Sequence, residues 1–259
     1  MNKILGQVAA GLAPLLLALQ VSSPPPAELS AFMSVGVQSA VEVLMPTFQK
    51  ASGYRVVPTW GTAAMVSKRV QDGEAADVLV STRAGMDDLL KEGKVMVGSD
   101  ALVARSRVGV AVRSGTPKPD IATAAALRRA LLAARAIAYS NPAAGGTSGV
   151  HFATVLERLG IAEQMKARTK FPPPGGLAAT LLVSGEVDLA VQQMPELAGV
   201  EGSELVGPLP ADLQLVTTFV AGVPTTAKHA DAAKAFVRFL QSPEAVAILK
   251  AKGLEVPAR

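Results

Sequence analysis

The sequence contains no cysteine, and its two histidines, His151 and His229, lie far apart in a chain of 259 residues. The missing thiols exclude disulfides, thiolate metal sites, a cysteine nucleophile and a lipid anchor on an N-terminal cysteine. Two distant histidines also argue against a histidine-rich zinc site. We therefore expect neither a bound metal nor a cofactor.

Strong charge of one sign is absent as well. The chain has 25 basic and 21 acidic residues, a formal net charge of +4 and no basic run. This balance predicts no nucleic-acid partner and no strongly membrane-binding face, whereas it suits a small anionic ligand. Apolar residues make up 49% of the chain, so a sizeable core is expected, in one large or two modest domains.

The first residues are typical of a secretory signal peptide. A short positive start is followed by an apolar stretch from residue 4 to residue 19, and then by small residues and prolines. We interpret residues 1–27 as a signal peptide, which predicts a periplasmic protein. An uncleaved anchor is the alternative. The apolar stretch is short for a membrane span, and Pro14 interrupts it, so we expect no stable membrane insertion.

Apolar runs and amphipathic segments alternate along the rest of the chain. This order predicts an α/β fold with mostly parallel strands and helices on both faces. Strands are expected at 28–37, 54–60, 76–81, 107–115 and 213–224, and helices at 38–53, 63–73, 84–95, 122–134 and 227–254.

Small polar residues stand where the expected strands meet helices, in the turns 34–38, 61–64, 144–149 and 192–196. Ligands of open α/β sheets bind at the carboxyl ends of the strands, so these turns are candidate binding segments. The stretch WGTAA (60–64) has no acid–base side chain, but it offers one hydroxyl and the N–H groups of a helix start. These groups are suited to holding an anion.

The segment YRVVPTWGTAAMVSKRVQDGEAADVLVS (54–81) resembles the periplasmic molybdate-binding proteins. In that family a strand runs into a Gly-Ser-Ser-type turn, a helix, a Gly-Ala-Pro-Ala-Asp-like element and a buried strand. The stretches 61–63 (GTA) and 73–77 (GEAAD) match the turn and the element, and 232–254 resembles the closing helices. The resemblance covers essentially everything after residue 27. The family also includes aconitate isomerase, a secreted enzyme that moves a double bond without a cofactor.

The resemblance implies a two-lobed, type II periplasmic binding protein fold with a ligand cleft between the lobes. Each lobe is expected to be a mostly parallel sheet flanked by helices. Lobe 1 would comprise residues 28–107 and 215–259, and lobe 2 residues 108–214, with hinge strands near 107–113 and 213–222. The implied partners are a small anion and an ABC-type permease, and we expect a monomer.

Some positions depart from the molybdate-binding pattern, in which serine hydroxyls, backbone amides and a tyrosine hold the oxyanion. Gly36 stands where the first turn usually has serine, although Ser34 is nearby, and Gln193 takes the place of the tyrosine. The turn at 141–149 is enlarged by glycines. Fewer hydroxyls and a roomier loop favour a larger anion, such as a di- or tricarboxylate, over a tight tetrahedral oxyanion.

The predicted function is periplasmic binding of a di- or tricarboxylate or another oxyanion, and the alternative is an aconitate isomerase that interconverts trans- and cis-aconitate. Binding is favoured because no evident base stands out. For an isomerase the candidate acid–base groups are His151, Lys68 and Glu196, each of which also fits a solvated or capping role. Helix capping is the competing role for the hydroxyls among the expected ligand contacts. Those contacts are Ser34, Thr62, Ala63, Thr147, Ser148 and Gln193.

Overall fold

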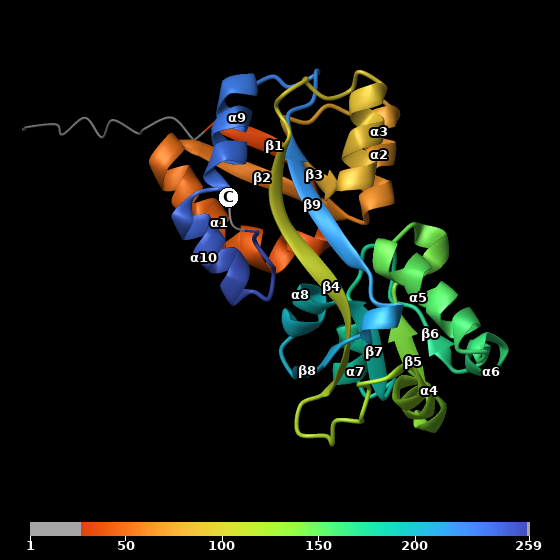
Figure 1. Cartoon of the computed structure of the whole chain (residues 1–259). Coiled ribbons are helices and arrows are strands. Elements are labelled where there is room, and N and C mark those ends of the chain that lie inside the picture. Colours follow the sequence, from red (N-terminus) through yellow and green to blue (C-terminus); the bar gives the residue numbers. More distant parts are fainter. Residues whose placement is uncertain (1–26, 258–259) are drawn as a thin grey trace, which may run out of the picture.

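The structure is a computed structural model in which residues 27–257 are described. Apart from Ala27, the signal peptide predicted for residues 1–27 lies outside the described residues. Figure 1 shows two lobes joined by the long strand β4 (Ala101–Arg113) and by β9 (Val216–Gly222), which run side by side. The expected two-lobed α/β fold is therefore confirmed.

The first lobe contains a five-stranded sheet with the order β2-β1-β3-β9-β4. β1 (Ala27–Ser34) pairs in parallel with β2 (Tyr54–Gly61) and β3 (Val78–Thr82), and β9 runs opposite to its neighbours. One face is covered by α2 and α3 and the other by α1, α9 and α10 (Figure 1), each over its own apolar cluster. These helices are α1 (Gln38–Ser52), α2 (Ala63–Gln71), α3 (Arg83–Lys91), α9 (Ala230–Phe239) and α10 (Pro243–Ala251).

In the second lobe the far half of β4 pairs antiparallel with β7 and β8, while β5 pairs in parallel with β6 and β7. The strands are β5 (Ile137–Tyr139), β6 (Thr169–Lys170), β7 (Leu189–Gln193) and β8 (Ser203–Pro208). The helices are α4 (Ala124–Ala133), α5 (Thr147–Arg158), α6 (Ala162–Lys166), α7 (Ala179–Val183) and α8 (Met194–Ala198). Single 3-10 turns are η1 (Val35–Val37), η2 (Pro142–Ala144) and η3 (Ala211–Leu213).

The strand β4 changes partners between Arg107 and Val108. Its first half pairs with β9, and the residues from Val108 onward pair with β7 and β8. The boundary between the lobes at residues 107 and 108 remains a prediction, and the change of strand partners at this point supports it. The expected strand at 107–115 begins earlier, at Ala101, because Arg105 and Arg107 alternate with buried residues and lie on its exposed face.

Asp77 fixes the entry to β3 and the start of α9. Its carboxylate accepts hydrogen bonds from the backbone and hydroxyl of Ser30, at 3.0 and 2.9 Å, and from the N–H groups of Lys228 and His229, both at 2.8 Å. Burial acts to raise the pKa of Asp77, but these hydrogen bonds outweigh it and leave the pKa below its ordinary value. One ionised side chain thereby ties three segments of the first lobe together.

Candidate functional site

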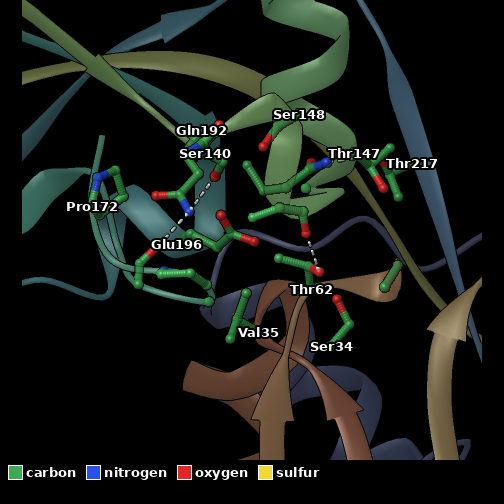
Figure 2. Close-up of a pocket in the computed structure, with 18 of the residues that line it drawn as sticks. Ser34, Val35, Thr62, Ser140, Thr147, Ser148, Pro172, Gln192, Glu196 and Thr217 are labelled. Carbon is green, nitrogen blue, oxygen red and sulfur yellow. Dashed lines mark hydrogen bonds between the residues drawn. The ribbon is translucent and has the colours of Figure 1, made fainter. Parts of the chain in front are cut away.

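The candidate site is a pocket between the lobes, where the carboxyl ends of several strands meet (Figure 2). Its free volume is about 30 Å³, which is enough for roughly two water molecules. The lining residues are Ser34, Val35, Thr62, Ala63, Ser140, Asn141, Ala144, Gly146, Thr147, Ser148, Pro172, Pro173, Pro174, Gly175, Gly176, Gln192, Gln193, Glu196, Thr217 and Phe219.

The first lobe supplies two neighbouring helix starts. Ser34 ends β1 and Thr62 follows β2, and these parallel strands are in register at Ser34 and Gly61. The hydroxyls cap the following turns, since Ser34 accepts from Gly36 N–H at 3.4 Å and Thr62 from Met65 N–H at 3.2 Å. The N–H groups at the first positions of α2, beginning with Ala63, have no acceptor within the helix and are suited to an anion.

The second lobe supplies the start of α5. No side chain caps this helix, and its first backbone bond runs from Val150 N–H to Gly146 O at 3.0 Å. The N–H groups of Thr147, Ser148 and Gly149 therefore have no intrahelical acceptor. They lie at the positive end of a helix of 12 residues, beside the pocket. The resulting site suits a negatively charged group.

The lobes touch at the rim of this pocket. The Thr62 hydroxyl donates to the carbonyl oxygen of Ala144 at 2.9 Å, across the two lobes (Figure 2). Gly145 has φ +70°, and a Cβ there would lie 2.3 Å from Cβ of Ala64. Glycine at this position thus permits both the left-handed backbone and the close approach of the lobes.

Two glutamines form hydrogen bonds that position the side of the pocket supplied by the second lobe. The Gln192 amide accepts from Ala178 N–H at 2.7 Å and donates to the Ser140 hydroxyl at 3.0 Å and the Gly176 carbonyl at 3.2 Å. It thereby holds the Pro172–Gly176 loop against the pocket. Gln193 donates to the Thr217 hydroxyl at 2.7 Å, and its own Oε1 is buried without a partner among the described residues.

Glu196 brings a carboxyl group into this pocket. The residue is 7% exposed, and its carboxyl lies between Ser140 and Thr62 in Figure 2. Burial raises the pKa of Glu196 to about 8, while the Gln193 backbone N–H lowers it by less. The Oε2 atom is buried and has no hydrogen-bond partner in the described part of the chain. At pH 7 the side chain is therefore mostly a neutral acid that can donate a hydrogen bond.

No lysine, arginine or histidine lines this pocket within residues 27–257. An anion would be held by N–H groups, hydroxyls and amides rather than by a salt bridge. Over the same residues, no group of three or more histidine, aspartate or glutamate side chains is placed to hold a metal ion. None of the helices described is long and apolar enough to cross a membrane.

The structure brings together all six predicted ligand contacts and Glu196, but not the other two acid–base candidates. Lys68 is exposed and paired with Asp72 at 2.9 Å, and His151 Nε2 lies 2.8 Å from the carbonyl oxygen of Leu213. Neither side chain lines the pocket. Thr62 caps α2 and also lies in the pocket, and its contact with a ligand stays a prediction. The solvated alternative for Glu196 is wrong because α8 packs the side chain inward.

Comparison with known proteins identifies the family. The family model described as bacterial extracellular solute-binding protein matches residues 29–255. The chain belongs to this solute-binding family. It is 30% identical to an aconitate isomerase from Pseudomonas sp over 246 residues, which are 92% of each chain. It is 20% identical to the molybdate-binding protein ModA of Escherichia coli, covering 88% of this chain and 89% of ModA.

A solved structure of a similar protein agrees with the fold. The periplasmic molybdate-binding protein of Azotobacter vinelandii superimposes with a TM-score of 0.72 at 24% sequence identity. The match covers 89% of this chain and all of that chain. The two-lobed arrangement is therefore shared with that protein, whereas this level of identity carries no information on the ligand.

Several lining residues of this solute-binding protein were not predicted, among them Ser140, Thr217 and Phe219. A serine directly after the strand IAY (137–139) was a usable signal for Ser140, because it stands at a strand end like the other contacts. Phe219 lies within a strand and has no local signal. A Cβ at Gly36 would lie 2.3 Å from Cζ of Phe219, so the ring of Phe219 occupies the space of the missing serine side chain.

Proposed function

We propose that this solute-binding protein holds a small organic polycarboxylate of the aconitate type between its two lobes. The observation that carries the proposal is the convergence of two helix starts, those of α2 and α5, on a pocket to which the described residues contribute no cationic side chain. N–H groups at a helix start that have no acceptor within the helix hold carboxylates and other oxyanions by hydrogen bonds and by the helix dipole.

Three features favour a carboxylate over a tetrahedral oxyanion. Phe219 occupies the space beside Gly36, so the first turn offers one hydroxyl, that of Ser34. Gln193 and the neutral acid of Glu196 add planar groups that can pair with a carboxylate. The 30% identity to an aconitate isomerase, against 20% to ModA, points the same way. Because the free volume is about 30 Å³, the lobes must part at the hinge to admit such a ligand.

A second candidate, an aconitate isomerase, is favoured by one specific observation. Glu196 is a buried carboxyl in the pocket with a pKa of about 8, and its unpartnered oxygen is suited to proton transfer. In its ionised form it would remove a proton from the methylene carbon of aconitate, and the electron pair of that C–H bond would form the new double bond. The same carboxyl would then return the proton to the former vinylic carbon. The helix N–H groups would stabilise the charge that develops on the carboxylate.

We also propose that the protein works in the periplasm and delivers its ligand to an ABC-type permease. The family model describes extracellular proteins, and the sequence predicts a signal peptide in residues 1–27. The isomerase role does not require the permease, so a permease requirement for growth on the ligand would favour the receptor role.

Proton NMR of the protein with trans-aconitate separates the two candidates. Saturation transfer to the ligand without new signals is the expected result for a receptor. Growth of cis-aconitate vinyl signals, abolished by heating the protein, would establish an isomerase. An isomerase that uses Glu196 as its base should lose turnover in Glu196→Gln and still bind the ligand. Absence of both saturation transfer and turnover would refute the aconitate-type ligand and return molybdate and sulfate to consideration.

A further inference from the structure

Among the described residues, the pocket suited to an anion is lined by one ionisable side chain, and that side chain is an acid. Within the described residues the lining includes Glu196 but no lysine, arginine or histidine. An ionised carboxylate here would repel a bound anion in a region of low dielectric constant. A neutral carboxyl would instead offer an O–H donor, and Oε2 has no other partner in the described residues.

The surroundings of α8 supply no compensating charge at the carboxyl. The helix packs against η1, α1, β4, β7 and β8. η1 and β7 carry no ionisable side chain, and none of the ionisable residues on the other three elements lines the pocket. These residues are Glu42 and Lys50 on α1, Arg105, Arg107 and Arg113 on β4, and Glu204 on β8.

The charged groups with recorded partners are engaged away from the pocket. Glu204 pairs with Lys118 at 2.7 Å, Arg107 pairs with Glu255 at 2.8 Å, and Glu42 accepts from the Gln38 amide at 2.8 Å. The environment of Glu196 thus consists of backbone dipoles, apolar groups and neutral polar side chains. Such an environment favours the protonated carboxyl.

We propose that Glu196 enters the complex as the neutral acid and donates its proton in a hydrogen bond to the bound carboxylate. This inference rests on the proposed binding of a carboxylate in the interlobe pocket. No covalent bond to carbon forms or breaks in this step. Where Glu196 is ionised in the free protein, each binding event takes up one proton from solution. The side chain then acts as a specificity residue, because it binds more tightly a ligand whose oxygen can accept its hydrogen bond.

The proposal predicts a characteristic pH dependence. Burial raises the pKa of Glu196 to about 8, so affinity should change little below pH 7. Above that pKa, affinity should fall about tenfold per pH unit, because the ionised fraction must be protonated before the ligand binds. Mutual repulsion spreads the pKa values of the ligand carboxyls upward from about 4, but all of them are ionised above pH 7, where the predicted fall in affinity lies.

Isothermal titration calorimetry with propane-1,2,3-tricarboxylate, which has no double bond to move, tests the proposal. Titrations from pH 6 to pH 10 in buffers of different ionisation enthalpy report both affinity and proton uptake. Wild-type protein should take up close to one proton per ligand at pH 9. Glu196→Gln keeps an N–H donor and loses the titration, so its affinity should be independent of pH and its proton uptake close to zero. Glu201→Gln, at an exposed position after the same helix, is the matched control and should behave as wild type.

The outcomes separate this inference from the proposed function. Binding by wild-type protein with pH-independent affinity and no proton uptake would overturn the inference and leave the function intact. An unchanged pH profile in Glu196→Gln would overturn it as well, since another group would then titrate. No heat with the tricarboxylate or with trans-aconitate would overturn the proposed function together with the inference.

Discussion

Replacing the buried acid in the pocket should stabilise this protein, and the gain should depend on pH. Glu196 has an ordinary carboxyl pKa of 4.5 when unfolded, and burial raises the pKa to about 8 in the native state. Between these values the native state holds a proton that the unfolded chain releases. Linkage therefore predicts that the free energy of unfolding falls as pH rises from 4.5 to 8.

The size of the effect follows from the width of this interval. One pH unit corresponds to about 1.4 kcal/mol, so Glu196 costs about 3 kcal/mol at pH 7 and on the order of 5 kcal/mol above pH 8. Glu196→Gln has nearly the same shape and no titration. Its free energy of unfolding should match that of wild type near pH 4 and exceed it increasingly up to about pH 8. Since domains are stable by roughly 5–15 kcal/mol, the difference should be easy to measure.

Urea unfolding of ligand-free protein, followed by circular dichroism at intervals from pH 4 to pH 9, is the appropriate assay. The quantity to compare is the difference between variant and wild type at each pH, because contributions of other titrating groups cancel in it. Glu201→Gln, at an exposed position, should show no pH-dependent difference. A constant difference between Glu196→Gln and wild type across the range would refute the burial argument, whatever its size.

Three further substitutions have defined expectations. Asp77→Asn should lower the free energy of unfolding at pH 7 by about 2–3 kcal/mol, because it disrupts a buried, hydrogen-bonded carboxylate. In urea unfolding this loss should shrink as pH falls below 4. The pKa of Asp77 is lowered in the native state, so its carboxylate stabilises the protein above the ordinary pKa and no longer does so in strong acid. Gly145→Ala should cost about 1 kcal/mol of backbone strain, and its clash with Ala64 should hold the lobes apart. In urea unfolding the variant should be less stable than wild type by about this amount, and equal stability would contradict the left-handed backbone at Gly145. Gln192→Ala should speed amide hydrogen exchange at Ala178 and weaken binding, and unchanged exchange there would show that the loop does not depend on Gln192.

Local pattern was sufficient for much of the fold. The helices at 38–53 and 63–73 and the strand between them have clear periodicity and end signals, so the βα order of the first lobe could be predicted. The short elements α6, α8 and β8 were missed, since segments of five or six residues carry little periodic signal. Their conformation depends on the sheet and helices against which they pack.

The candidate site was predictable to the extent that a strand end can be read from the chain. Ser34, Thr62, Thr147 and Gln193 each follow an apolar strand or a small-residue turn, and all of them line the pocket. Phe219 was not predictable, because its role depends on the missing side chain of Gly36 on another strand.

By itself the sequence determined the absence of thiol chemistry, the modest charge, the alternation of strands and helices, and the helix starts that can hold an anion. These properties are local or compositional, so composition and periodicity suffice to read them. The tertiary structure alone decided that Glu196 is buried in the pocket while Lys68 and His151 are held elsewhere. A glutamate near a helix start is ordinarily solvated. Here the packing of α8 against β4, β8 and η1 removes it from water, and that desolvation gives it the properties of a proton donor.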